Sequence, residues 1–217
     1  TNFNERFDGR LHYNTSKRLN NGFIRNGYNV LTMSDRDIIY YNKSITDPKG
    51  VKKFNTKVFN TFLNFKPDLI VLGHADSLSN ETLQKIKQIK NVKICQWFLD
   101  PLIQKGPDYK NNRKRILKLE KYVDASFLTS DPKALNFKIK NSFFIPNPSD
   151  LSFEMIDNSL QKKNKDLFFA MSHGVHRGKL KKGKYDEREK FLDKLQDKLV
   201  DIDFDFFGYD NKEPLWA

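Results

Sequence analysis

Apolar positions along the chain follow two different spacings. Over residues 51–65 they recur at every third or fourth position, which predicts a helix. Similar spacing or helix-capping signals predict helices over residues 15–27, 79–90, 112–122 and 186–199, and a short one after Pro132. Continuously apolar runs between them predict buried strands. These runs cover residues 28–34, 66–74, 92–101, 124–130, 142–148, 166–172 and 203–208.

Helix ends are signalled by particular residues. Thr15 or Ser16 is expected to cap the first helix, and Gly27 is expected to end it. A Ser or Asn at the start of residues 79–90 is the expected cap of the third. Strands that alternate with such helices are typical of an α/β protein with a doubly wound parallel sheet.

The alternation of predicted strands and helices is interrupted once. Residues 151–165 are rich in Lys and Asn and follow Pro146 and Pro148, which indicates a linker. We therefore expect a Rossmann-like domain over residues 1–150, a linker over 151–165 and a second Rossmann-like domain that begins at 166–217. The first domain starts with a helix and the second has two strands, so we expect a portion of a longer chain, with a first strand and much of the second domain missing.

Composition limits the location and the partners. No run approaches the roughly 20 apolar residues of a membrane span, no signal peptide is expected, and the single Cys95 suits a reducing cytoplasm. Lys and Arg outnumber Asp and Glu by 39 to 27, giving a net charge of +12. That excess favours nucleotides, anionic lipid headgroups or nucleic acid as partners, although scattered lysines also serve solubility. Nucleic acid is the weakest of these, because no nucleic-acid-binding motif is present.

One loop combines glycine with positive charge. The segment "FFAMSHGVHRG" leaves an apolar strand at residue 171, and Gly174 lets backbone N–H groups approach an anion. Arg177 can bind phosphate oxygens with two hydrogen bonds, and His176 and Lys184 lie close by in the sequence. A plain basic turn is the alternative. A metal site is disfavoured, because two histidines without a nearby Cys fall short of a zinc ligand set.

Three titratable side chains lie at predicted loop or strand ends in the first domain. His12 follows a glycine in "ERFDGRLHY", His74 follows a strand in "LGHADS", and Asp100 follows a strand in "WFLDP". Each is a candidate for proton transfer. Each also has a structural alternative, as an exposed helix residue, a core histidine and a turn cap, respectively. The sequence does not select a pair.

The order of several passages resembles a known family. "KPDLIVLGH", "CQWFLDP", "VDASFLTSD" and "FFIPNPSD" resemble the N-terminal domain of GT-B glycosyltransferases, and "FFAMSHGVHRG" with "FDFFG" resembles the opening of their C-terminal domain. The similarity extends to the spore-maturation CgeB-like group and to related bacterial family 1 or 4 transferases. It covers nearly the whole chain in order, and it depends on that order and on the "IPNPSD" hinge more than on any single motif.

The resemblance implies a cytoplasmic, hexosyltransferase-like bacterial enzyme that acts on a cell-envelope glycan. Its two Rossmann-like domains would face each other across a cleft, with the acceptor on the first and the nucleotide sugar on the second. It implies no metal or other cofactor, and a peripheral contact with the inner face of an anionic membrane. The catalytic candidates would be His12, His74 and Asp100. Gly174, His176, Arg177 and Lys184 would bind the donor phosphates.

The alternative function is a noncatalytic α/β module that binds nucleotides or polyanions, because fold does not determine function. The late second-domain segments that contact base and sugar in the family have no counterpart in this sequence, so those contacts stay unassigned.

Overall fold

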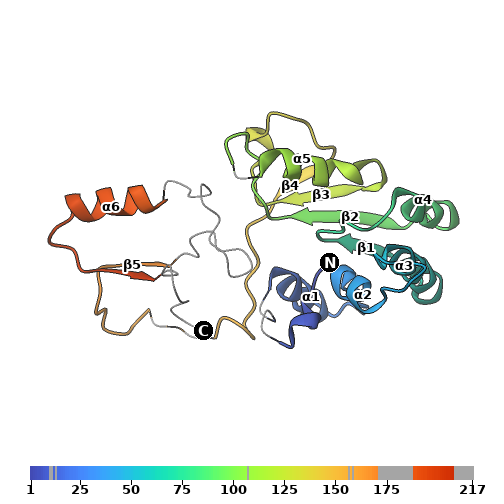
Figure 1. The fold of residues 1–217 in the computed structure, drawn as a ribbon, viewed down its shortest axis with the longest axis horizontal. Coiled ribbons are helices and arrows are strands. Elements are labelled where there is room, and N and C mark those ends of the chain that lie inside the picture. Colours follow the sequence, from blue (N-terminus) through green and yellow to red (C-terminus); the bar gives the residue numbers. More distant parts are fainter. Residues whose placement is uncertain are drawn as a thin grey trace. The chain divides into compact units, whose positions relative to one another are not determined.

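A computed structural model describes residues 1–9, 12, 14–106, 108–155, 157, 159–170 and 188–207. The chain divides into two compact units, Thr1–Met155 and Ile156–Ala217 (Figure 1). Each contains a parallel sheet.

The first unit is built around four parallel strands in the order β1-β2-β3-β4. Trp97 pairs in register with Phe127, and Phe127 with Phe143. The α/β class and the parallel sheet expected from the alternating pattern are confirmed, and this unit is consistent with a Rossmann-like domain. The strands are β1 (Leu69–Leu72), β2 (Lys93–Phe98), β3 (Ala125–Leu128) and β4 (Ser142–Phe144).

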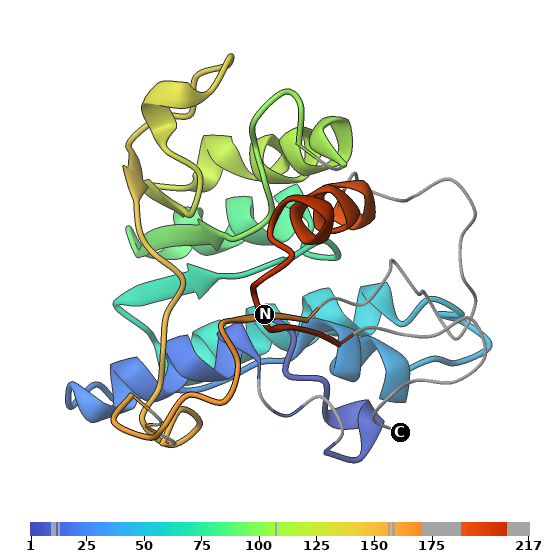
Figure 2. The same cartoon turned by 90° about the vertical axis from the view of Figure 1, so that its left-hand side faces the viewer.

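Helices connect these strands and cover the sheet (Figures 1 and 2). Those predicted at residues 51–65, 79–90 and 112–122 are confirmed as α3, α4 and α5, the last ending earlier and continuing as a 3-10 turn. The helices are α1 (Thr15–Arg25), α2 (Asp35–Tyr41), α3 (Val51–Phe65), α4 (Asn80–Ile89) and α5 (Tyr109–Lys118). The 3-10 turns are η1 (Glu5–Phe7), η2 (Glu120–Tyr122) and η3 (Pro132–Ala134).

One face of the sheet carries two core clusters, and Cys95 and Trp97 of β2 are buried on the other face. Leu72, Ile94, Phe98 and Leu128 alternate along their strands and point to the first face, where they are buried. Two clusters cover it. The larger comes from α3, α4 and the strands β1 and β2: Phe54, Phe62, Leu72, Ala75, Leu78, Leu83, Ile86, Val92, Ile94 and Leu119. The smaller lies beside α5: Phe98, Leu102, Ile116, Leu128 and Ile139.

Local signals fix several helix ends. Ser79 caps α4 as expected, accepting a hydrogen bond from the Thr82 amide at 3.2 Å. The expected cap of α1 is wrong by one residue: Asn14, not Thr15 or Ser16, accepts from the Lys17 amide. At the start of α3, Gly50 has φ +66°, and a Cβ there would lie 2.4 Å from the Ile39 carbonyl oxygen. Glycine is therefore required for α3 to begin against α2.

The strand expected at residues 28–34 is not formed. This stretch has no ladder with another strand in the described structure; the Thr1 amino group donates to the Met33 carbonyl, and the Asp35 amide donates to the Thr1 carbonyl. An apolar run needs a paired neighbour to become a strand. The seven-residue helix α2 follows instead, and it was not predicted because it is shorter than the window over which helical spacing is recognisable.

The second unit contains a parallel β-α-β arrangement, as predicted. Strands β5 (Leu167–Ala170) and β6 (Phe204–Phe207) pair with Phe169 opposite Phe206, and α6 (Arg188–Lys198) lies between them in the sequence. At the start of this sheet, Lys165 Nζ forms an ion pair with Asp203 Oδ1 at 2.9 Å. Across the described residues of both units, no helix has the length and apolar character needed to cross a membrane.

Candidate functional site

Polar side chains gather where β1 and β2 end. Gly73, His74 and Asp76 follow β1, and Asp100 follows β2; because the strands are parallel, both loops leave the same edge of the sheet. The packing is close there, since a Cβ at Gly73 would lie 2.5 Å from Thr1 Oγ1 and 3.3 Å from Trp97 Nε1. Ligands of α/β proteins bind at this carboxyl edge.

Arg115 on α5 joins these loops. Its Nε donates to Asp76 Oδ1 at 2.9 Å and its Nη2 to Asp76 Oδ2 at 2.8 Å. Its Nη1 donates to Asp100 Oδ2 at 3.2 Å, and Nη2 also lies 3.1 Å from His74 Nδ1. The hydrogen bond and charge of Asp76, together with the charge of Asp100, raise the pKa of Arg115. One guanidinium therefore contacts all three side chains.

The contacts of His74 determine its tautomer. Arg115 can only donate, so Nδ1 of His74 accepts and the ring proton of the neutral imidazole lies on Nε2. Nε2 is buried, has no hydrogen bond among the described residues, and lies 3.5 Å from Asp100 Oδ2. Burial lowers the pKa of His74, Asp100 acts to raise it, and Arg115 lowers it further. The imidazole is therefore neutral at pH 7, with both nitrogens facing protein groups.

Asp76 lies between several cations. Arg36 on α2 approaches its Oδ2 at 3.4 Å, while Lys118 donates to the backbone carbonyls of Asp76 and Leu78. Burial alone would raise the pKa of Asp76, but the hydrogen bonds and charge of Arg115 lower it overall. Asp76 is thus an ionised counterion of the cluster.

Asp100 differs from Asp76 because only one of its carboxylate oxygens accepts a hydrogen bond from Arg115. Its Oδ2 faces Arg115 and His74, whereas Oδ1 has no hydrogen bond with the described residues, and the side chain is 29% exposed. A carboxylate held through one oxygen can accept a proton or a hydrogen bond at the other. Asp100 is therefore the member of the cluster that can contact a hydroxyl group.

Asp35 is a buried carboxyl near the cluster. It is 1% exposed, and neither of its oxygens has a hydrogen bond in the described part of the chain. Burial raises its pKa, against the opposing charges of the Thr1 amino group and of Arg36. Asp35 is the first residue of α2, so it precedes the Arg36 that reaches Asp76.

The predicted residues thus have different positions. His74 and Asp100 come together, whereas the ring of His12 packs edge-on against Phe153, with centroids 5.8 Å apart. The predicted phosphate-binding residues lie outside the described residues: Gly174, His176, Arg177 and Lys184.

Sequence reasoning missed Arg115 and Arg36. A signal for Arg115 exists in the helix pattern, because Asn112 and Ile116 of α5, with Leu119 directly after the helix, form a buried stripe that residue 115 borders. Arg36 has no such signal, since α2 itself was not predicted.

A hollow beside β4, lined by residues that include Glu120, Leu135, Phe137 and Lys140, has none of the cluster residues in its lining. In the described residues, no group of three or more His, Cys, Asp or Glu side chains could hold a metal ion.

The sequence matches no protein-family model, and it has no significant match among curated proteins.

Proposed function

We propose that this chain is part of a GT-B-type glycosyltransferase, which moves a sugar from a nucleotide-sugar donor to a hydroxyl group of a glycan, lipid or protein acceptor. The observation that carries the proposal is the meeting of His74, Asp100 and Arg115 at the carboxyl edge of a parallel sheet. In α/β proteins, substrates bind at this edge.

In this proposal Asp100 is the base. Its Oδ1 accepts the proton of the acceptor hydroxyl, while Arg115 Nη1 donates to Oδ2, which lies 3.5 Å from His74 Nε2. His74 is then a positioning residue, because both ring nitrogens are already directed at protein groups. A base of this kind contributes roughly 10²- to 10⁴-fold to the rate.

The donor side of the proposal depends on the second unit. Its parallel β5-α6-β6 arrangement is of the kind that binds nucleotides at the loop after the first strand. The sequence after β5 holds Gly174, His176, Arg177 and Lys184, which we assign to the diphosphate of the donor. Positive side chains would then stabilise the leaving group without a metal ion.

The test measures release of nucleoside diphosphate from a panel of nucleotide sugars by the intact protein. Asp100→Asn should lower turnover at least about 100-fold with little change in donor affinity, because the base is lost and the donor contacts are kept. Asp68→Asn is the matched control, since Asp68 is an exposed carboxylate paired with Lys90 on the opposite edge of the sheet. Equal turnover of Asp100→Asn and the control would exclude this role for Asp100.

A noncatalytic binding module is the second candidate, and one observation favours it. The cluster neutralises itself, because Arg115 and Arg36 face Asp76 and Asp100 and leave little net charge. A binding module would be thermally stabilised by UDP or GDP without releasing nucleoside diphosphate from any donor.

A further inference from the structure

The strand β4 forms a free edge of the first sheet. It is the last strand in the order β1-β2-β3-β4, and no strand of the described residues pairs with its outer side (Figure 1). The Ile145 amide donates to the Leu128 carbonyl of β3. Because the backbone groups of successive residues alternate between the two sides of a parallel strand, those of Ser142 and Phe144 point away from β3. An added strand can bond to these groups.

The side chains of this edge are aromatic and exposed. Phe143 is 53% exposed and Phe144 is 59% exposed, on opposite faces of the sheet. Phe143 stacks on Phe127 of β3, with ring centroids 5.8 Å apart, and Phe144 lies in register with the buried Leu128. Edge strands that stay unpaired usually carry charged residues, because an apolar edge pairs readily with another chain. The edge of β4 therefore has the character of an interaction surface.

A hollow adjoins this edge. It has a volume of about 760 Å³, and its apolar lining is Leu135, Phe137 and Ile139, from the segment between η3 and β4. Ile139 belongs to the smaller core cluster, and Leu135 and Phe137 pack against that cluster. Ser142, at the start of β4, also lines the hollow, which places the hollow directly beside the free edge. A side chain of an added strand can therefore enter it.

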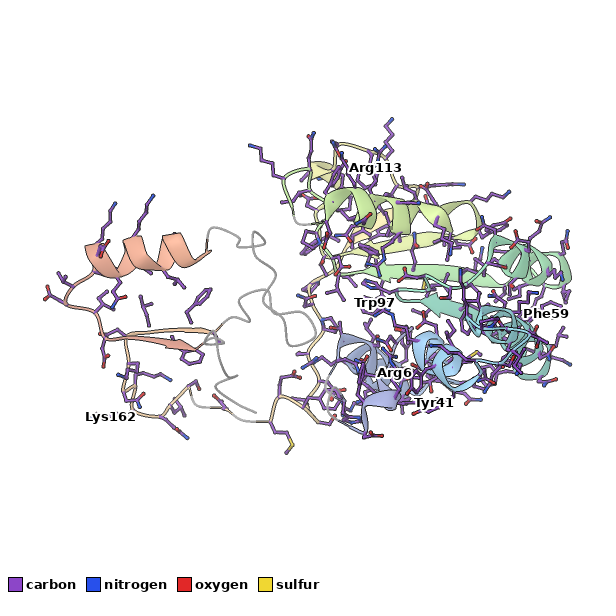
Figure 3. The ribbon with its side chains drawn as sticks, viewed as in Figure 1. Arg6, Tyr41, Phe59, Trp97, Arg113 and Lys162 are labelled. Carbon is purple, nitrogen blue, oxygen red and sulfur yellow. The ribbon has the colours of Figure 1, made fainter. Side chains whose placement is uncertain are left out.

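The wall of the hollow is held by α5. The Arg113 guanidinium, labelled in Figure 3, lies 5.1 Å from the centre of the Phe137 ring. The Tyr109 ring packs edge-on against the same ring, with centroids 6.3 Å apart, and its hydroxyl donates to Asn136 Oδ1. These contacts position the segment before a partner arrives, so binding does not have to order it.

The lining of the hollow has a surplus of positive charge. Lys138 and Lys140 are exposed, and neither forms an ion pair with a carboxylate of the described residues. Glu120 is the one acidic residue of the lining, and its Oε1 accepts a hydrogen bond from the Lys140 amide at 2.9 Å. Asp131 and Lys133, just outside the lining, carry opposite charges and leave the surplus unchanged. An acidic residue of a partner would meet an unpaired ammonium group here.

We propose that the β4 edge binds an extended peptide of another protein as an additional β-strand. The peptide backbone bonds to Ser142 and Phe144, one apolar side chain enters the hollow, and an acidic residue pairs with Lys138 or Lys140. In this mode of recognition the main-chain hydrogen bonds supply affinity and the hollow supplies specificity. A second copy of the chain fits less well, because its own segment 138–148 holds two lysines and no acidic residue. The proposal is independent of the proposed function, since the hollow and the cluster share no residue.

Fluorescence polarisation with labelled synthetic peptides tests the proposal on the intact protein. The probe is an acetylated peptide of about nine residues, in which valine alternates with phenylalanine and leucine and both ends are acidic. A control peptide has lysines at both ends, and we expect it to bind at least about tenfold more weakly. Two further peptides are the probe N-methylated at its even or at its odd residues. One of them should lose binding and the other keep it, because only one edge of the peptide faces β4.

Charge reversal tests the two lysines. The variant with Lys138→Glu and Lys140→Glu should invert the preference, so that the lysine-ended peptide binds at least about tenfold more tightly than the acidic probe. The control variant carries Lys52→Glu and Lys57→Glu on α3, where both lysines are exposed and neither has an ion pair in the described structure. It should keep the wild-type preference. All four positions are exposed, and circular dichroism confirms that each variant is folded.

Hydrogen exchange followed by NMR locates the bound peptide. The acidic probe should slow exchange of the Ser142 and Phe144 amides, while the Phe143 amide, which faces β3, should change little. Equal binding of the acidic and lysine-ended peptides, or no binding of the probe by the wild type at about 1 mM, would overturn the proposal. So would unchanged binding of both N-methylated peptides. A dimer in sedimentation that Phe144→Lys dissociates would assign the edge to a second copy of the chain instead.

Discussion

Arg115 and Asp76 are joined by two side-by-side hydrogen bonds, from Nε to Oδ1 at 2.9 Å and from Nη2 to Oδ2 at 2.8 Å. The pair ties α5 to the loop that follows β1, although 39 positions separate the two residues in the sequence. Because the guanidinium is planar and rigid, this geometry also fixes how Arg115 faces His74 and Asp100.

Replacing Arg115 by lysine should show the value of this geometry. Arg115→Lys keeps the charge but cannot make two parallel hydrogen bonds, and the pair is partly exposed, so we expect a loss of about 1 kcal/mol in the free energy of unfolding. Urea denaturation measures it. Arg113→Lys is the control, since Arg113 is an exposed α5 residue without a carboxylate partner in the described structure. Equal stability of the two variants would show that the paired hydrogen bonds contribute nothing.

The lowered pKa of His74 predicts a pH dependence of stability. Between the unfolded pKa of about 6.5 and the lower folded value, the unfolded chain binds more protons, so the free energy of unfolding falls as pH falls through this window. Above this pH window, the contribution of His74 to the free energy of unfolding no longer changes with pH. His74→Gln should remove this slope, measured as the difference between wild type and variant in urea denaturation from pH 7.5 to 5, in steps of about half a pH unit.

The neighbours of His74 should shift its titration in opposite directions. NMR titration of the ring should show a higher pKa in Arg115→Met, which loses a positive charge, and a lower pKa in Asp100→Asn, which loses a negative one. Shifts of the same sign in both variants would contradict the charge arrangement described here.

Most of the first sheet could be predicted from the sequence because its signals are local. The mostly apolar sequence of β2 predicts a buried strand, and five of its six residues are buried in the structure. α3 shows helical spacing over its whole length. Residues 28–34 look equally apolar, but strand formation depends on a partner that local sequence does not reveal. The helix α2 was not predicted for a different reason: it is too short for a helical spacing of apolar residues to be recognised.

The candidate site was predictable only where topology decides it. His74 and Asp100 each follow a parallel strand, and this alone places them at one edge of the sheet. The position of Arg115 depends on the rotation of α5 about its axis, which selects one of six basic residues in segment 109–121. His12 depends on the path of the chain after η1, for which the sequence holds no comparable rule.

The single cysteine should be unreactive in the folded protein. Cys95 is buried in β2, and burial, with the charge of Asp124, raises its pKa to about 11. At pH 8 the native thiol should react with a thiol reagent at least about 100-fold more slowly than the unfolded chain, whose thiol has a pKa near 8.5. The assay is unambiguous because the chain has one Cys. A native rate within about tenfold of the unfolded rate would show that β2 opens readily.

The segment that follows the first sheet is held on α1 by ion pairs. Asp150 accepts hydrogen bonds from Arg25 at 2.6 Å and from the Ser152 amide at 2.8 Å. Glu154 accepts from Arg18 Nε at 2.7 Å. Ser152 and Arg25 lower the pKa of Asp150, so its carboxylate stays ionised well below neutral pH.

Removing the Asp150 carboxylate should therefore release this segment. Phe153 lies within it, with its ring 5.4 Å from the Arg18 guanidinium, and we expect Asp150→Ala to speed chymotrypsin cleavage after Phe153 several-fold, because a protease needs a locally detached chain. Asp157→Ala is the matched control, since Asp157 lies just beyond the segment and bonds the Ser159 amide. Mass spectrometry of the early fragments identifies the cut. If both variants are cleaved after Phe153 at the wild-type rate, the Arg25–Asp150 pair does not hold the segment, and packing around Phe153 must do so.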